Sequence, residues 1–353
     1  MNILDHSMNN KKIDLRSDTV TLPTNEMREA MLKAKIGDDV YQEDPTVNQL
    51  EEIAAKKLGK EKALFVPSGT MGNLLAVLTH CKRGEDAILE ANSHIYCEEV
   101  GGMSAVAGVS PRLVVGERGV LNPEEVKKAI RGKDIHFSKT TLICLENTHN
   151  MAGGTVIPLQ IMEEICEIAH QSGIPIHLDG ARLFNAALAL GVKPVLFTKN
   201  FDSIMFCLSK GLGAPVGSIL AGSKEFIQKA RKNRKMLGGG MRQAGILAAA
   251  GIIALEKMVE RLQADHEKAL TLGKSLNKIE GIDVDLETLQ TNMVYFDIKK
   301  SGLDTFQFLS KLEKNNILGY PRPPSKVRFV THYGISKEDI YTTIEVIKEI
   351  LKN

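Results

Sequence analysis

The strongest constraint on the fold is an alternation of short apolar segments with helical ones between residues 63 and 208. The apolar segments have the length of strands, and the stretches between them carry apolar residues at helical spacing. Strands buried on both faces and joined by helices form parallel sheets that helices cover on both sides. The sequence therefore predicts an α/β fold with a mostly parallel sheet. The expected strands are 63–66, 87–89, 111–115, 141–145, 174–178 and 204–208.

Helix signals complete this pattern and suggest a second domain. Asp44 and Pro45 predict an N-cap followed by proline at the first helical position, and Gly59 predicts the end of that helix. We expect an N-terminal arm (1–25), a large domain (26–260) and a small α+β C-terminal domain (261–353), with one long helix bridging the domains. Other expected helices are 24–31, 74–78, 122–130, 158–172, 244–276, 305–315 and 337–352, and further expected strands are 282–286, 293–298 and 327–331.

Charge and composition favour a protein that acts on small molecules. The 353 residues contain 45 Lys and Arg against 43 Asp and Glu, so no basic surface predicts nucleic-acid or membrane binding. The longest apolar run, 244–255, is too short to cross a bilayer. The first 12 residues are polar, and the five cysteines form no Cys-x-x-Cys pair. We therefore expect a cytoplasmic location and reduced cysteines.

Lys210 is the first candidate for an active-site residue. The strand pattern of 204–208 ends in Ser209 and Lys210, and a glycine-rich turn follows. In α/β folds, the C-terminal ends of parallel strands carry the active site. The neighbours of Lys210 are small or apolar, which favours a partly desolvated amine that forms an imine with a cofactor. The alternative is an ordinary solvated lysine at a strand end.

The segment 67–73 predicts a phosphate site. It consists of small residues between the strand 63–66 and an apolar helix, so free N–H groups at the helix start, with the hydroxyls of Ser68 and Thr70, would hold a phosphate. The segment lacks the lysine of a Walker A loop and the spacing of a dinucleotide fingerprint. The alternative is a capped helix start without a ligand.

Asp179 is the third candidate for the active site, after Lys210 and the segment 67–73. It ends the strand pattern 174–178 and lies 31 positions before Lys210. A cofactor with a pyridine ring needs an acidic partner to keep the ring nitrogen protonated. A phosphate site, an aspartate and a lysine at successive strand ends together indicate a pyridoxal phosphate site.

With these residues in place, the chain resembles the threonine aldolases, fold type I pyridoxal phosphate enzymes of the β-eliminating lyase family. The resemblance covers nearly the whole length. One departure is Glu98, which stands where the family commonly has an aromatic residue. The similar segments are 15–21, 67–73, 93–94, 145–149, 177–182, 209–213, 238–242 and 327–332.

The resemblance implies a role for each candidate residue. Lys210 would hold the cofactor covalently, Asp179 would pair with its ring nitrogen, and His94 would stack on its ring and, like His136, lie near the substrate hydroxyl. The other implied contacts are Ser68, Gly69 and Thr70 for the phosphate, Arg182 for the cofactor and the substrate carboxylate, Ser17 and Arg328 for the substrate carboxylate, and Arg242 for the phosphate of a neighbouring subunit. It implies no metal site.

The implied activity is retro-aldol cleavage of L-threonine or L-allo-threonine to glycine and acetaldehyde, with His94 or His136 taking the hydroxyl proton. The implied assembly is a homotetramer built as a dimer of dimers. Alternatives are a β-eliminating lyase, an aminotransferase, a serine hydroxymethyltransferase-like enzyme and a non-catalytic protein that binds the cofactor.

Overall fold

The computed structural model describes residues 11–352. The chain forms two compact units: one is Leu22–Glu260, and the other joins the segment that ends at Thr21 to the segment that begins at Arg261. Residues 1–10 of the expected N-terminal arm lie outside the described residues.

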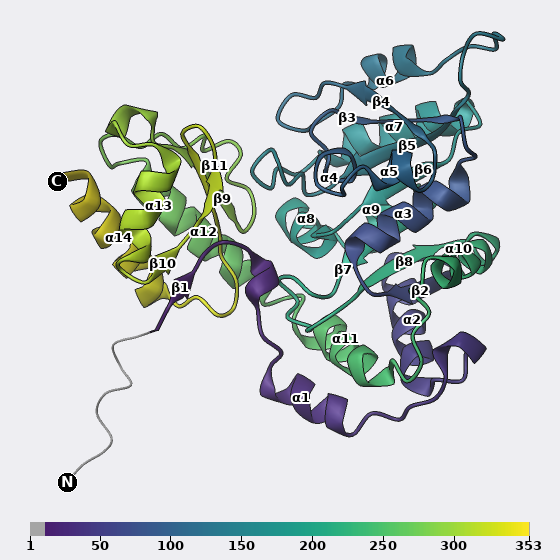
Figure 1. Ribbon diagram of the computed structural model, residues 1–353, viewed down its shortest axis with the longest axis horizontal. Helices are drawn as coiled ribbons and strands as arrows, with labels where there is room; N and C mark the ends of the chain where they lie inside the picture. Colours follow the sequence, from purple (N-terminus) through teal and green to yellow (C-terminus); the bar gives the residue numbers. More distant parts are fainter. Residues whose placement is uncertain (1–10, 353) are drawn as a thin grey trace. The chain divides into compact units, whose positions relative to one another are not determined.

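The first unit is built on a seven-stranded sheet (Figure 1). Its strand order is β2-β8-β7-β6-β5-β3-β4, and β8 runs in the direction opposite to that of the other six strands. The expected mostly parallel sheet is confirmed. The strands are β2 (Lys62–Val66), β3 (Asp86–Glu90), β4 (Ser110–Val114), β5 (Thr140–Glu146), β6 (Ile176–Asp179), β7 (Ser203–Cys207) and β8 (Ser218–Gly222).

The central strands are buried because helices cover both faces of the sheet. On β2, Leu64 and Val66 belong to a core with residues of α3 and α10, whereas Phe65 between them points to the other face. The helix α2 contacts β2 and also packs on α9 and α11. The helices of this unit are α1 (Asn25–Leu32), α2 (Pro45–Leu58), α3 (Gly69–His80), α4 (His94–Cys97), α5 (Gly102–Ala105), α6 (Pro123–Ala129), α7 (Leu159–Gln171), α8 (Leu183–Leu190), α9 (Pro194–Thr198), α10 (Lys224–Met236) and α11 (Gly245–Lys257), with a 3-10 turn η2 (Asp39–Tyr41).

The second unit is an α+β arrangement around its own apolar core. A three-stranded antiparallel sheet in the order β11-β12-β9 places Phe296 and Phe329 in contact, with ring centroids 5.0 Å apart. Its elements are β1 (Ile13–Asp14), η1 (Asp18–Val20), α12 (Leu262–Leu276), β9 (Met293–Asp297), η3 (Lys299–Ser301), α13 (Thr305–Glu313), β10 (Ile317–Leu318), β11 (Tyr320–Arg322), β12 (Lys326–Val330) and α14 (Lys337–Lys352).

The start of the expected arm is part of this second unit. β1 pairs in parallel with β10, and Leu15 is fully buried in the same core. The start of the expected arm, Ile13 and Asp14, is therefore a strand within the second unit. The partner strand lies some 300 positions away in the sequence, so no local pattern could reveal it.

Two further expectations differ from the structure. The long helix over 244–276 is two helices, α11 and α12, separated at Met258–Arg261, where neither glycine nor proline marks the break. The expected strand 282–286 is irregular and contributes one isolated bridge, between Asp283 and Asp297. The strand β8 is absent from the expected strands, because it follows a glycine-rich turn directly and has only three apolar residues among its five.

Across residues 11–352, none of the helices combines the length and apolar character needed to cross a membrane.

Asp44 ties three segments of the first unit together. Its buried carboxylate caps α2 by accepting the N–H groups of Thr46 and Val47 at 3.1 and 3.0 Å. The other oxygen accepts the N–H groups of Gly37 and Gly245 at 3.2 and 2.8 Å. The N-cap predicted from the sequence is confirmed, and the same side chain also fixes the start of α11.

We predict that Asp44→Ala lowers the free energy of unfolding by about 2–4 kcal/mol, because it removes an N-cap and leaves further N–H groups without their acceptor. Urea denaturation followed by circular dichroism measures the change. Asn122→Ala is the matched control, because Asn122 caps α6 at the surface through one bond to the N–H of Glu124. If both substitutions cost the same, Asp44 acts only as a helix cap.

Candidate active site

The C-terminal ends of neighbouring parallel strands bring acidic side chains to one edge of the sheet. Glu146 ends β5 and Asp179 ends β6, and the two residues are register partners. β7 pairs with β6 on its other side, with Asp179 opposite Met205. The chain then leaves β7 toward Lys210. The sheet edge predicted to carry the active site therefore bears Asp179, and the connection that follows β7 at this edge contains Lys210.

Lys210 lies in the tight connection between β7 and β8. Its carbonyl accepts the N–H of Gly213 at 2.8 Å, and the N–H of Leu208 bonds the carbonyl of Gly217 at 3.0 Å. Gly217 has a φ of +107°, and a Cβ there would lie 2.3 Å from Cε2 of Phe65. Glycine suits this position best, so the turn that holds the partly buried Lys210 is fixed by the backbone conformation of Gly217 and its packing against the Phe65 ring.

The start of α3 has the geometry of a phosphate site. Ser68 is the N-cap, and its Oγ accepts the N–H of Met71 at 3.2 Å. The first N–H groups of a helix have no carbonyl partner within the helix, and they attract anions. A Cβ on Gly69 would lie 2.9 Å from Sγ of Cys207, so the first turn of α3 packs closely on the end of β7. The exposed hydroxyls of Ser68 and Thr70 stand at this turn.

Asp179 is almost completely buried, with 1% of its surface exposed. Oδ2 accepts a hydrogen bond from Nδ2 of Asn73 at 2.8 Å, and Oδ1 accepts one from the N–H of Ala181 at 3.0 Å. Both donors are neutral, and a buried carboxylate is stabilised most by an opposite charge. A protonated pyridine nitrogen would supply that charge, so the site fits pyridoxal phosphate.

His94 joins this group through Glu99. Nδ1 of His94 lies 2.9 Å from Oε1 of Glu99, and the same oxygen accepts a hydrogen bond from Nδ2 of Asn73 at 2.8 Å. Asn73 therefore bridges Asp179 and Glu99. Burial lowers the pKa of His94, but the hydrogen bond to Glu99 and the charge of Asp179 outweigh it, so the pKa is raised overall.

The ligand atoms of His94, Glu99 and Asp179 lie within 4.8 Å of one another, a spacing that also suits a metal ion. Nδ2 of Asn73 donates to Oε1 of Glu99 and to Oδ2 of Asp179, and Nδ1 of His94 also lies within hydrogen-bond distance of Oε1 of Glu99. A cation would compete with these donors for the same oxygens. We therefore interpret the three residues as a hydrogen-bonded cluster.

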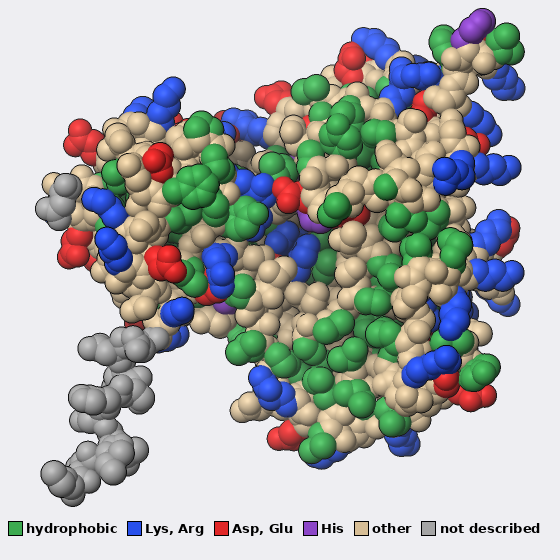
Figure 2. All heavy atoms as spheres, viewed as in Figure 1, with side chains coloured by type: hydrophobic (Ala, Val, Ile, Leu, Met, Phe, Trp, Pro, Cys, Tyr) green, Lys and Arg blue, Asp and Glu red, His purple; other side chains and the backbone are tan. Residues whose placement is uncertain are grey.

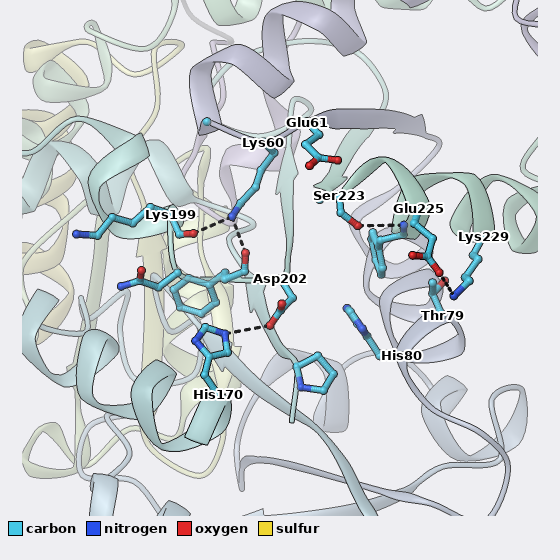
Figure 3. Close-up of a pocket in the computed structure, with 16 residues that line it drawn as sticks. Lys60, Glu61, Thr79, His80, His170, Lys199, Asp202, Ser223, Glu225 and Lys229 are labelled. Atoms are coloured by element: carbon cyan, nitrogen blue, oxygen red, sulfur yellow. Dashed lines mark hydrogen bonds and ion pairs between the residues drawn. The ribbon is translucent and has the colours of Figure 1, made fainter. Parts of the chain in front are cut away.

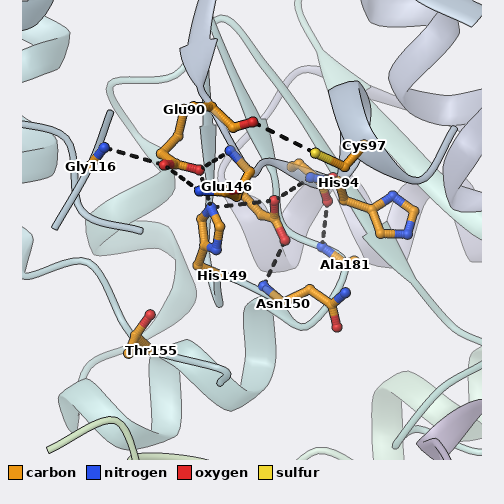
Figure 4. A network of polar contacts seen from close by, with 12 residues as sticks. Glu90, His94, Cys97, Gly116, Glu146, His149, Asn150, Thr155 and Ala181 are labelled. Carbon is orange, nitrogen blue, oxygen red and sulfur yellow. Dashed lines mark hydrogen bonds and ion pairs between the residues drawn. The ribbon is translucent and has the colours of Figure 1, made fainter. Parts of the chain in front are cut away.

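A second buried group supports the backbone at His94 (Figure 4). Glu146 accepts the N–H of His94 at 2.7 Å and the N–H of Asn150 at 2.8 Å. Nε2 of His149 lies 3.0 Å from Oε2 of Glu90 and 3.9 Å from Glu146. Burial lowers the pKa of His149, and these two carboxylates raise it above its ordinary value. Protonated His149 thus balances part of the negative charge of Glu90 and Glu146.

The residues expected to bind the substrate carboxylate fall into both units. Arg182 is buried and directly precedes α8 in the first unit. In the second unit, Arg328 on β12 is also buried, and its Nη2 donates to the carbonyl of Arg16 at 3.0 Å. Ser17 follows Arg16 and caps η1. The second unit therefore brings Ser17 and Arg328 onto adjoining segments.

Two expected site residues make their hydrogen bonds away from the cluster of His94, Glu99 and Asp179. The side chain of His136 is 79% exposed, and its Nδ1 lies 2.7 Å from Oδ1 of Asp134. The side chain of Arg242 is 57% exposed, and its Nη1 lies 3.1 Å from Oδ2 of Asp38. Their expected roles stay predictions.

A surface hollow lies at the opposite edge of the sheet, near the starts of β6 and β7 (Figure 3). Its cationic and acidic side chains are largely engaged with the protein: Lys60 donates to the carbonyl of Phe201, and His170 lies 3.3 Å from Asp202. Parallel sheets carry their chemistry at the other edge. We therefore assign the active site to the edge that bears Asp179.

Sequence reasoning assigned no role to Asn73, Glu99 or His177. Asn73 is a fully buried amide on α3, four positions after Gly69, and its contacts come from β6 and the segment after α4. A polar residue within an otherwise apolar helix face is the available signal. Its partners lie 26 and 106 positions away, so their identity is a property of the fold.

Comparisons with known proteins agree with this site. The β-eliminating lyase family model matches residues 14–299. Low-specificity L-threonine aldolase 1 of Arabidopsis thaliana is 47% identical over 97% of each chain, and the low specificity L-threonine aldolase of Escherichia coli K12 is 44% identical over 93% of this chain and 96% of its own. A solved structure of Leishmania major threonine aldolase shares the fold, with a TM-score of 0.82 and 19% identity over 96% of this chain and 99% of its own. The chain belongs to the β-eliminating lyase family of fold type I enzymes.

Proposed function

We propose that this protein is a pyridoxal phosphate-dependent lyase that cleaves L-threonine and L-allo-threonine into glycine and acetaldehyde. The observation that carries the proposal is the buried Asp179 carboxylate at the sheet edge. The names of the relatives support the substrate, since both the plant and the bacterial relative are threonine aldolases.

The proposed roles follow the geometry where the structure supplies it. The start of α3, with Ser68, Gly69 and Thr70, would hold the cofactor phosphate, and Asp179 would face the ring nitrogen. Lys210 would hold the cofactor covalently, and His94 would lie against its ring.

The family resemblance adds Arg182, Ser17 and Arg328 as ligands of the substrate carboxylate.

The bound cofactor supplies an electron sink for the pair of electrons released from the Cα–Cβ bond. The charge of Asp179 keeps the ring nitrogen protonated, and the arginines orient the substrate by its carboxylate. His94 or His136 removes the proton of the β-hydroxyl as the carbonyl of acetaldehyde forms. A proton returned to Cα completes glycine.

Product analysis separates this proposal from its rivals. Purified protein with pyridoxal phosphate and L-threonine, without folate, is expected to give glycine and acetaldehyde in equal amounts. A β-eliminating lyase would release ammonia and a 2-oxo acid, an aminotransferase would need an amino acceptor, and a hydroxymethyltransferase acting on serine would need folate. A cofactor-binding protein without catalysis would give no product, and any of these results would contradict the proposal.

We predict that Lys210→Ala reduces threonine cleavage by at least about 100-fold, because the amine both anchors the cofactor and moves protons. Borohydride treatment of the yellow native protein should attach the cofactor permanently to the peptide that contains Lys210, as mass spectrometry would show. Lys232→Ala, at an exposed position of α10, is the control. Label on another lysine would show that the assignment is wrong.

We predict that Asp179→Asn retains the cofactor but loses at least about tenfold in turnover, because a charge-assisted hydrogen bond contributes about 1.5–3 kcal/mol. Cofactor content is measured by absorbance and turnover by acetaldehyde release. Asp86→Asn is the matched control, since Asp86 is equally buried but lies at the start of β3. Equal turnover of the two variants would contradict the role of Asp179.

We also propose a homotetramer in the cytoplasm, with the dimer as the catalytic minimum. All five cysteines are free thiols, which fits a reducing compartment. Figure 2 shows hydrophobic side chains gathered over the region of α1 and α11, a feature typical of an interface. Exposed hydrophobic side chains on these two helices and on the segment after α1 include Leu32, Ile246 and Ile36. Most of α11 itself is buried within its own unit.

The family resemblance further suggests that Arg242 reaches the phosphate of a neighbouring subunit. We predict that a mixture of two inactive variants, Lys210→Ala and Arg242→Ala, regains activity after subunit exchange, because a hybrid dimer would place both defects in one site. Acetaldehyde release measures the recovery, and native mass spectrometry verifies the exchange. With exchange verified and no recovery, Arg242 would serve its own subunit, where it pairs with Asp38.

A further inference from the structure

We propose that Glu99 is a positioning residue that holds the Nδ1–H of His94 and leaves Nε2 of the same ring as the proton acceptor. This inference rests on the proposed function, in which the substrate hydroxyl must lose a proton. Glu99 lies in the turn between α4 and α5, five positions after His94. Its side chain is 4% exposed, so its contacts are set by the fold.

The argument begins with the amide of Asn73. Its Nδ2 lies 2.8 Å from Oε1 of Glu99 and 2.8 Å from Oδ2 of Asp179, and its Oδ1 lies 3.1 Å from Nε2 of His177. This orientation gives each carboxylate one amide proton and leaves the amide oxygen for an imidazole N–H. The opposite orientation would set an amide oxygen against two carboxylates.

A buried chain of hydrogen bonds continues from that amide through His177 to Ser203 and His80. Nδ1 of His177 lies 2.9 Å from Oγ of Ser203, which lies 2.8 Å from Nε2 of His80. Burial lowers the pKa of His177 to about 3 and that of His80 to about 4, so both rings are neutral at physiological pH. Because Oδ1 of Asn73 accepts from Nε2 of His177, Nδ1 of His177 accepts the hydroxyl proton of Ser203, and Oγ of Ser203 in turn accepts an N–H from Nε2 of His80.

Oε1 of Glu99 is therefore an acceptor from both sides. Asn73 donates to it on one side, so Nδ1 of His94, 2.9 Å away, must donate on the other. An imidazole that carries its proton on Nδ1 has its lone pair on Nε2, as a general base requires. Glu99 thus selects the tautomer of His94 and keeps the ring in one orientation.

Burial and the charge of Asp179 raise the pKa of Glu99, and the hydrogen bonds from His94 and Asn73 oppose that rise by stabilising the charged form. In its charged form Glu99 also makes His94 a stronger base. Three carboxylates face this ring from different elements: Glu99 after α4, Asp179 at the end of β6 and Glu146 at the end of β5. Burial opposes the charged ring, and the hydrogen bond to Glu99 is the largest of the opposing effects. Removing only the charge of Glu99 should therefore lower the pKa of His94 while leaving the ring in place.

The variant Glu99→Gln tests whether the charge of Glu99 raises the pKa of His94, because glutamine keeps the shape of the side chain and an acceptor oxygen. We expect the midpoint of the acid limb in the pH dependence of kcat to fall by about 1 pH unit or more, with about a tenfold loss of maximal rate. The titration of the His94 ring, followed by NMR of protein with ¹⁵N-labelled histidine, should shift in the same direction. Glu124→Gln, at an exposed position of α6, should change neither midpoint.

The NMR spectrum of the unsubstituted protein provides a readout that needs neither turnover nor a variant. It should show His94 with its neutral-form proton on Nδ1 and His177 with its proton on Nε2. A proton on Nε2 of neutral His94, or an unchanged His94 midpoint in Glu99→Gln, would overturn the proposal. Absence of threonine cleavage by the unsubstituted protein would instead contradict the proposed function and leave the NMR result to decide the role of Glu99.

Discussion

The structure depends on keeping one negative charge, that of Asp179, buried at the edge of a sheet. Burying a carboxylate without compensation costs several kcal/mol, so the surrounding residues must supply donors. The N–H of Ala181 and the amide of Asn73 supply two of them. The remaining compensation would come from a cation in the site, and a pyridinium ring provides it. The same charge that is costly for folding is thus the basis of the chemistry.

The helix α3 serves both ends of the expected cofactor. Its first turn presents N–H groups to a phosphate, and Asn73, one turn later, reaches the carboxylate that would face the ring nitrogen. Glycine at position 69 lets this turn approach β7 closely. Since one rigid helix sets both contacts, the distance between the phosphate site and Asp179 is built into the fold.

Local patterns in the sequence predict most of the fold and the parts of the site that end strands or begin helices. Asp44 and Gly59 delimit α2 because caps are local chemistry, and Lys210 and Asp179 stand out because each follows an apolar strand. The pairing of Ile13 with Ile317 and the bridge made by Asn73 join distant segments, so they follow only from the folded chain. The break between α11 and α12 carries no glycine or proline, and helical periodicity alone missed it.

The most direct test of the account is a crystal structure of the protein grown with pyridoxal phosphate. The account predicts continuous electron density from Lys210 to the cofactor, the phosphate at the start of α3, and the ring nitrogen within about 3 Å of the Asp179 carboxylate. A phosphate bound elsewhere, or a ring nitrogen facing a residue other than Asp179, would contradict it.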